Sequence, residues 1–187
     1  MRILGITASS IDPSFAFESI ATQAVTSNTL TVTFGSIPQD YSSLQLRILS
    51  RSTRTAMANL NIQINGVTSS SYTRHELSAD GATVTSSGAV AGGVTTASIA
   101  RSTGTDSASD VFAVSIIDIH DSNSTTKNKT IRSLYGIDNN SASPAGVIGV
   151  RSVLFMQTSA VTSITLSSAS STNFVAGSVF SLYGIRS

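Results

Sequence analysis

Apolar and polar residues alternate along much of this 187-residue chain. A period of two places successive side chains on opposite faces of a β-strand. In residues 30–34, for example, Leu30, Val32 and Phe34 alternate with threonines. The segments with the clearest alternation are 30–34, 44–48 and 60–64. Each of them predicts a strand with one buried face.

Further strands are expected in the second half of the chain, separated by clusters of Ser, Asn, Asp and Gly that favour turns. They are predicted at residues 111–119, 129–137, 147–157, 161–166 and 178–185. No window of ordinary helix length carries an apolar stripe of period 3.6. Many short strands without helices between them predict an all-β fold, an antiparallel β-sandwich of jelly-roll-like type.

The chain has the length of one domain with a sizeable core, and no linker-like run divides it. We expect a short N-terminal arm at residues 1–14 and a β-sandwich domain at residues 15–187. The arm contains Gly5, Pro13 and several small residues. Residues 86–98 are rich in Ser, Gly and Ala and are predicted to form a long loop.

The sequence SLYGI occurs twice, at residues 133–137 and 181–185. Alternation puts Leu134 and Gly136 on one strand face, and Leu182 and Gly184 likewise, with each Tyr on the opposite face. A glycine within a strand marks a bulge or a close backbone approach. Two ligand-binding tyrosines are the functional alternative, but we interpret both copies as structural strands of the core or of a subunit contact.

The composition limits the classes of partner. Ser and Thr together occupy 59 positions, whereas charged residues make up 11% of the chain and the formal net charge is +1. Such a chain lacks the basic footprint that nucleic acid or an anionic membrane would require. A polar surface with few charges is typical of a protein whose faces are covered by neighbours. There are no cysteines, and no apolar run reaches membrane-spanning length.

Asp118, His120 and Asp121 form the densest group of acidic and imidazole side chains. They could supply part of a metal site or a proton-transfer pair, but no third ligand is evident, and carboxylates at strand ends commonly bind turn groups. Common hydrolase and nucleotide-binding motifs are missing. We therefore assign no catalytic residue, metal or cofactor, and we expect the protein not to be an enzyme.

Basic residues gather in two short segments, and we expect them to form ion pairs with carboxylates such as Asp118, Asp121 and Asp138, within a subunit or across subunits. These basic residues are Arg47, Arg51, Arg54, Lys127, Lys129 and Arg132.

Several segments carry a likeness to a known group of proteins. They read FESIATQAV, SIPQDYSSLQLR, IIDIHDSNSTTKNKTIRSLYGIDNN, AVTSITL and FSLYGI, and they span about residues 17–185. Together they resemble small virion structural proteins of tailed bacteriophages, including cyanophages and marine phages. The resemblance implies a β-sandwich in a virion that decorates the capsid or belongs to a tail or fibre. It brings no catalytic residues.

Composition and resemblance together predict a capsid decoration, or cement, protein on the capsid exterior. Its expected partner is the major capsid protein, and we expect a homotrimer that binds neither nucleic acid nor membrane. Ile3, Leu4 and Ile6 of the arm are the candidate partner-binding residues. A head-fibre or tail module that recognises a host-surface glycan is the alternative. A polysaccharide-degrading enzyme is a third hypothesis, weakened because no pair of carboxylates stands out.

Overall fold

The computed structural model describes residues 17–139 and 146–186, but not the side chains of residues 90–92. The regular structure of the described residues consists of twelve strands and one short 3₁₀ turn, Ala169–Ser171. The strands are β1 (Phe17–Ala24), β2 (Thr31–Phe34), β3 (Ser43–Ser50), β4 (Ala58–Ile64), β5 (Tyr72–Ala79), β6 (Val84–Val94), β7 (Ala97–Ser102), β8 (Ala113–Ile119), β9 (Lys129–Asp138), β10 (Gly146–Phe155), β11 (Ile164–Ser168) and β12 (Val179–Ile185). Among the described residues, no helix is long and apolar enough to cross a membrane.

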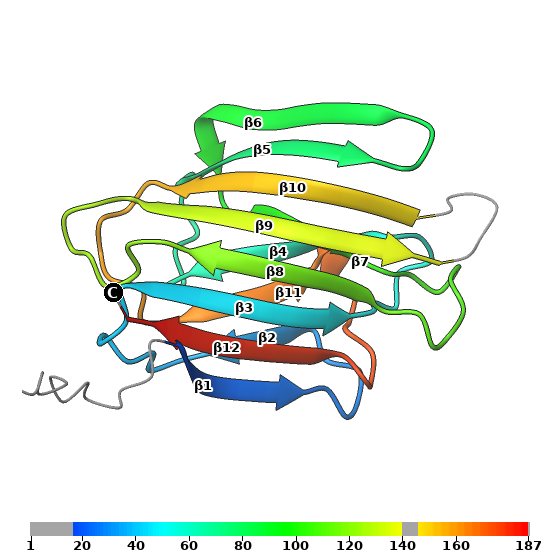
Figure 1. The fold of residues 1–187 in the computed structure, drawn as a ribbon, viewed down its shortest axis with the longest axis horizontal. Coiled ribbons are helices and arrows are strands. Elements are labelled where there is room, and N and C mark those ends of the chain that lie inside the picture. The colour runs from blue at the N-terminus through cyan, green and yellow to red at the C-terminus, as the bar shows by residue number, and fades with distance from the viewer. Residues whose placement is uncertain (1–16, 140–145, 187) are drawn as a thin grey trace, which may run out of the picture.

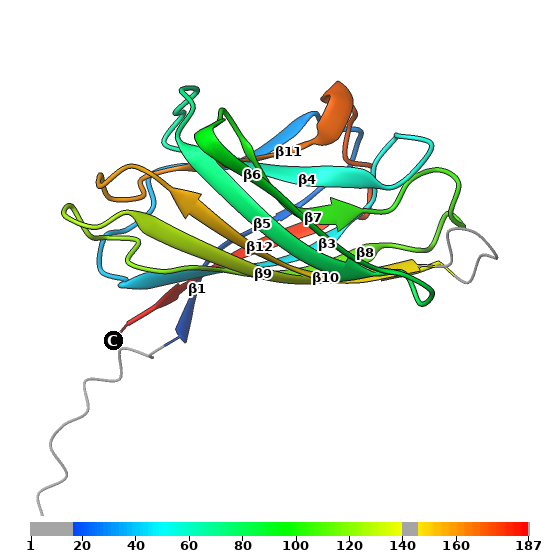
Figure 2. The ribbon, with the colours of Figure 1, turned by 90° about the horizontal axis from the view of Figure 1, so that it is seen from above.

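The strands form two antiparallel sheets that pack face to face (Figure 1, Figure 2). The large sheet has the order β1-β12-β3-β8-β9-β10-β5-β6, and the small sheet has the order β2-β11-β4-β7. Figure 1 shows the large sheet in front of the small one. The predicted all-β antiparallel sandwich is therefore confirmed.

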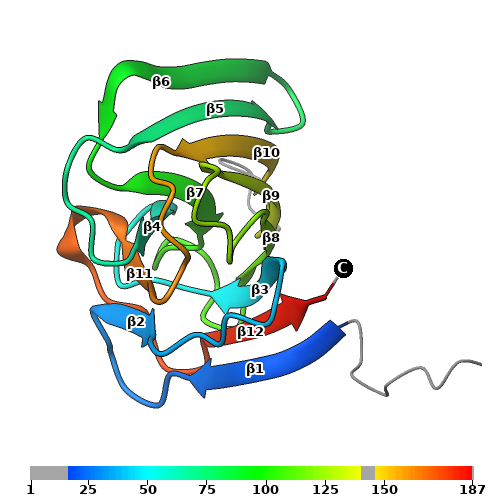
Figure 3. The same ribbon diagram turned by 90° about the vertical axis from the view of Figure 1, so that its left-hand side faces the viewer.

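Eight of the strands have the pairing of a jelly roll, which is built from two interlocking Greek keys. These eight strands can be numbered 1 to 8 in chain order, as β1, β2, β3, β4, β7, β8, β11 and β12. In this numbering, the order of neighbouring strands is 1-8-3-6 in the large sheet and 2-7-4-5 in the small sheet. The two remaining hairpins, β5–β6 and β9–β10, join the large sheet beyond β8 (Figure 3). They make this sheet twice as wide as its partner.

The core lies between the sheets and is filled by the inward-facing half of each alternating strand. Leu46 on β3, Ile62 on β4, Leu166 on β11 and Phe180 on β12 are completely buried. Burial of each such side chain stabilises the fold by about 1.5–3 kcal/mol. The Phe180 ring also packs edge-on against Phe174, with ring centroids 4.8 Å apart. The apolar positions predicted at 44–48 and 60–64 are all core residues.

Two predictions about the first half of the chain are wrong. Residues 86–98 do not form a long loop, because most of them belong to β6 and β7. Leu30 lies before β2 and is half exposed, whereas Val32 and Phe34 are buried as expected. The predicted arm, including Ile3, Leu4 and Ile6, lies outside the described residues.

Candidate interaction surface

The two SLYGI sequences lie in the same sheet with opposite orientations. On β9, Tyr135 faces the core and Leu134 faces outward, where its side chain is 50% exposed. On β12, Leu182 is completely buried and Tyr183 faces outward. Alternation within each copy is as predicted, but only the second copy places its leucine in the core.

The orientation of β9 belongs to a wider inversion of polarity across β9, β10 and β5. The inner face carries Ser133, Arg151 and Glu76 in one row, all of them buried. The adjacent outer row carries Leu134, Val150 and Leu77, all of them exposed. A sheet with only one buried face has the reverse pattern.

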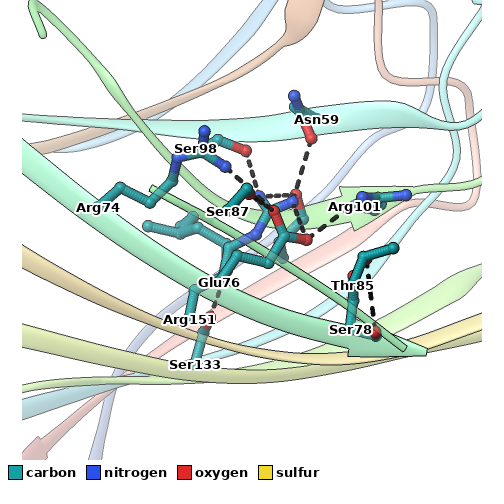
Figure 4. Close-up of polar contacts among 12 residues, drawn as sticks. Asn59, Arg74, Glu76, Ser78, Thr85, Ser87, Ser98, Arg101, Ser133 and Arg151 are labelled. Atoms are coloured by element: carbon teal, nitrogen blue, oxygen red, sulfur yellow. Dashed lines mark hydrogen bonds and ion pairs between the residues drawn. The ribbon is translucent and has the colours of Figure 1, made fainter. Parts of the chain in front are cut away.

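The inner polar row forms a network centred on the Glu76 carboxylate (Figure 4). Arg151 lies 2.9 Å from Glu76 Oε1 and Arg101 lies 3.3 Å from the same oxygen. Arg74 lies 3.1 Å from Oε2, and the Tyr135 hydroxyl donates a hydrogen bond to Oε1. Burial alone would raise the pKa of Glu76, but the hydrogen bonds from Tyr135 and Arg151 and the nearby positive charges lower it to about 2.

This network joins the large sheet to the open edge of the small sheet. Arg151 donates to the carbonyl of Ala100 over 2.9 Å, and the Ser133 hydroxyl donates to the carbonyl of Ile99. Both carbonyls belong to β7, the last strand of the small sheet. An unpaired strand edge is otherwise a template for unwanted pairing. The network is therefore structural, since Glu76 is bonded to side chains of both sheets and Arg151 is bonded to Glu76 and to the β7 backbone.

The outer face of the large sheet carries two apolar rows that run across the strands (Figure 1 views this sheet from outside). Cross-strand register places Leu49, Val114, Gly136, Ile148, Ala79 and Val84 in one row. The second row holds Ile116, Leu134, Val150 and Leu77. Large apolar side chains of these rows are 40–72% exposed. We call these two rows the apolar face.

Shallow hollows make the surface of the apolar face uneven. One of about 850 Å³ lies over β5, β6 and β10, where Leu77 and Val150 meet His75 and Arg132. Another of about 580 Å³ lies alongside the middle of the first row, next to Val114, Gly136 and Ile148. Hollows of this kind can receive the side chains of a protein partner.

A polar border runs beside the apolar face on β3, β8 and β9. The Arg47 Nε donates to Gln45 over 3.0 Å, and the Gln45 amide donates to Asp118 over 2.8 Å. Arg132 completes the series, 3.3 Å from the other Asp118 oxygen. These groups satisfy one another across neighbouring strands.

An aromatic pair stands at the β1–β12 end of the same face. The rings of Phe17 and Tyr183 stack with centroids 4.8 Å apart. The Arg47 guanidinium lies 5.3 Å from the Phe17 centroid and 5.4 Å from that of Tyr183. This cation–π contact links the aromatic pair to the polar border.

The acidic group singled out in the sequence does not converge on one point. Asp118 belongs to the polar border, whereas Asp121 lies in the turn after β8 and binds Lys127 over 2.8 Å. His120 lies between them in the turn and is exposed. Within the described residues, no three His, Cys, Asp or Glu side chains are placed to hold a metal ion.

The expected ion pairs exist for two of the six basic residues, Arg132 with Asp118 and Lys127 with Asp121. Among the described residues of one chain, the other four bind no carboxylate, and pairs across subunits stay a prediction. Arg51 donates to the carbonyls of residues 107, 108 and 111, and Arg54 donates to that of Met57. Lys129 is completely buried, and its Nζ donates to three carbonyls within 2.9 Å. Arg47 binds Gln45 and the two rings.

Comparison of the chain with protein families, with curated proteins and with solved structures gave no match. The apolar face is thus identified from its own residues. Sequence reasoning missed it, although β8 offered a signal. Its sequence AVSIIDI has apolar residues at consecutive positions, as strands covered on both faces do.

Proposed function

We propose that this chain is a structural protein of a bacteriophage virion, where it decorates the capsid exterior and stabilises contacts between major capsid subunits. The observation that carries the proposal is the apolar face: exposed Val114, Ile116, Leu134 and Val150 lie outside a sheet whose inner side holds buried charges. Exposed apolar surface of this extent on a soluble domain indicates a protein interface. The assignment to a virion rests on the sequence resemblance, and jelly rolls are common in viral capsid domains.

The proposed contribution is mechanical. Packaged DNA pushes outward on a shell whose subunit contacts are individually modest. A homotrimer that touches several capsid subunits at once gains avidity without strong single contacts. In this scheme the sandwich holds the trimer together and contacts capsid subunits, and the arm, with Ile3, Leu4 and Ile6, is a second contact to the capsid.

Imaging of intact particles tests this role. We expect hundreds of copies at regular positions on the outside of the capsid. Deletion of residues 1–14 should leave the sandwich folded and reduce its attachment to particles. Equal attachment of the truncated and full chains would remove the arm from the scheme.

The alternative is a receptor-binding module of a head fibre or tail. Jelly rolls also occur in lectins, and the stacked Phe17 and Tyr183 rings beside Arg47 offer apolar ring surface next to hydrogen-bonding groups. A few copies confined to fibre or tail tips, together with retention on host-surface glycans, would support this role and contradict decoration.

A further inference from the structure

We propose that the apolar face is the surface through which copies of this chain associate with one another. This inference rests on the proposed function, from which it takes the homotrimer, and it adds which side of the sandwich each copy uses. The centre of the contact is formed by Val114, Ile116, Leu134 and Val150, which lie on the adjacent strands β8, β9 and β10.

The first argument is the amount of exposed apolar surface. Of the ten large apolar side chains that are exposed in the described part of the chain, eight lie in the two rows of the apolar face. A ninth, Phe17, lies on the same side of the sheet, stacked on Tyr183. Apolar surface scattered at random would be shared between both sheets. Its concentration on one face indicates that the face is covered in the assembled protein.

The size of the face suits a stable contact. The first row crosses six strands and the second crosses four, and neighbouring strands lie about 4.8 Å apart, so the face extends roughly 25 Å across the sheet. With the polar border they form three rows about 7 Å apart and cover on the order of 600 Å² of sheet. This area is of the same order as the roughly 800 Å² that each partner contributes to a standard interface.

The inverted polarity of the sheet indicates that the outer apolar residues belong to an interface. At Ser133–Leu134, the serine is buried and the leucine is half exposed. At Val150–Arg151, the valine is exposed and the arginine is buried and paired with Glu76. Burying these polar groups requires hydrogen-bond partners, which they have except at Arg151 Nε, whereas apolar residues facing water gain nothing. The outer apolar side chains are therefore explained by a second covered face.

The charges beside the apolar face favour a second copy as the occupant. Arg47, Asp118 and Arg132 include both signs, and they are already bonded to Gln45, to one another or to aromatic rings. His75 is the remaining titratable group at this border. The border carries two arginines and one aspartate, and two further aspartates line the hollow beside the first row, so the surface offers no large excess of one sign to a polyanion or an anionic membrane. Two copies of it do not repel, and homo-oligomers with closed symmetry are the commonest assemblies of soluble proteins.

Sedimentation of the full chain with two added charges tests the proposal. Ile116 and Leu134 are cross-strand neighbours, and the variant Ile116→Lys with Leu134→Lys places two positive charges at the centre of the face. Thr33→Lys with Thr165→Lys is the matched control, because these residues are cross-strand neighbours on the outer side of the small sheet.

At micromolar concentration we expect the unmodified chain and the control variant to sediment well above the monomer mass; the homotrimer of the proposed function has three times that mass. The lysine pair at the apolar face should shift the protein to monomer and raise the dissociation constant by at least about 100-fold, since juxtaposed like charges cost several kcal/mol. Circular dichroism checks that each variant is folded. If the double variant does not fold, Val114→Lys, opposite Gly136, replaces it.

A monomeric unmodified chain, or an unchanged oligomer in the Ile116→Lys/Leu134→Lys variant, would overturn the proposal. The result is independent of the particle experiment. A trimer that forms in solution but does not attach to capsids would contradict capsid decoration and leave this interface intact.

Discussion

Leu134 and Leu182 occupy the same position in two identical five-residue sequences, yet they lie on opposite sides of one sheet. The inner side at β9 receives the Tyr135 ring, which fits because Gly149 on β10 has no side chain at that point. The inner side at β12 receives Leu182, and Gly184 leaves room there for the Tyr41 ring. Register with neighbouring strands, and not the local sequence, decides which residues face the core.

Leucine-to-alanine substitutions should therefore have unequal effects in the two copies. Leu182→Ala removes a completely buried side chain and should lower the free energy of unfolding by about 2–5 kcal/mol. Leu134→Ala should change it by no more than about 0.5 kcal/mol in the monomer, as exposed substitutions usually do. Chemical denaturation at a concentration below association compares them. Equal losses would contradict the opposite orientations.

The glycines of the two copies provide a second matched pair. A Cβ at Gly184 would overlap the Tyr41 ring, so Gly184→Ala should destabilise the fold by about 2 kcal/mol or more. A Cβ at Gly136 meets nothing within 4 Å, so Gly136→Ala should be neutral or slightly stabilising in the monomer. Thermal melting of the two variants measures this. A Gly136→Ala variant that melts as early as Gly184→Ala would show that the assigned faces are wrong.

Removal of Arg151 should be among the most damaging substitutions of a charged residue. Arg151→Leu leaves the buried Glu76 carboxylate and the Ala100 carbonyl without a main donor, and the expected cost is about 3–5 kcal/mol. Lys127→Leu breaks an exposed pair with Asp121 and should cost between about 0 and 1 kcal/mol. Denaturant unfolding of both variants measures the two losses of stability. Similar midpoints would refute the predicted difference.

The same network should make the fold sensitive to acid. The pKa of Glu76 is lowered from 4.5 to about 2 in the folded chain, so the folded state binds its proton less readily than the unfolded state does. This stabilisation is complete above about pH 4.5 and is lost as the pH falls toward 2, and it amounts to about 3 kcal/mol. Unfolding of the unmodified chain and of Glu76→Gln should be measured at pH 5.5 and 2.5. The loss between these pH values should be smaller in Glu76→Gln, and equal losses would exclude Glu76 as its source.

The sequence predicts the sandwich where alternation of large apolar residues is strict, as at Leu44–Ile48 and Leu60–Ile64. It fails at residues 86–98, because small residues such as Ser, Gly and Ala give no contrast between faces, and β6 is recognised only by its pairing with β5. The inner network is also hidden, since Glu76 and Arg151 are far apart along the chain and meet only through the β5–β10 register. The apolar face follows from that same register across six strands.

A thiol placed at the centre of the apolar face tests most directly whether that face is covered by another copy. The chain has no cysteine, so Leu134→Cys introduces a single thiol at a site that is half exposed in the monomer, and Thr33→Cys is the control on the small sheet. We predict slow alkylation of residue 134 at micromolar concentration and rapid alkylation after dilution, with residue 33 reacting rapidly throughout. Rapid and concentration-independent alkylation at residue 134 would contradict the account.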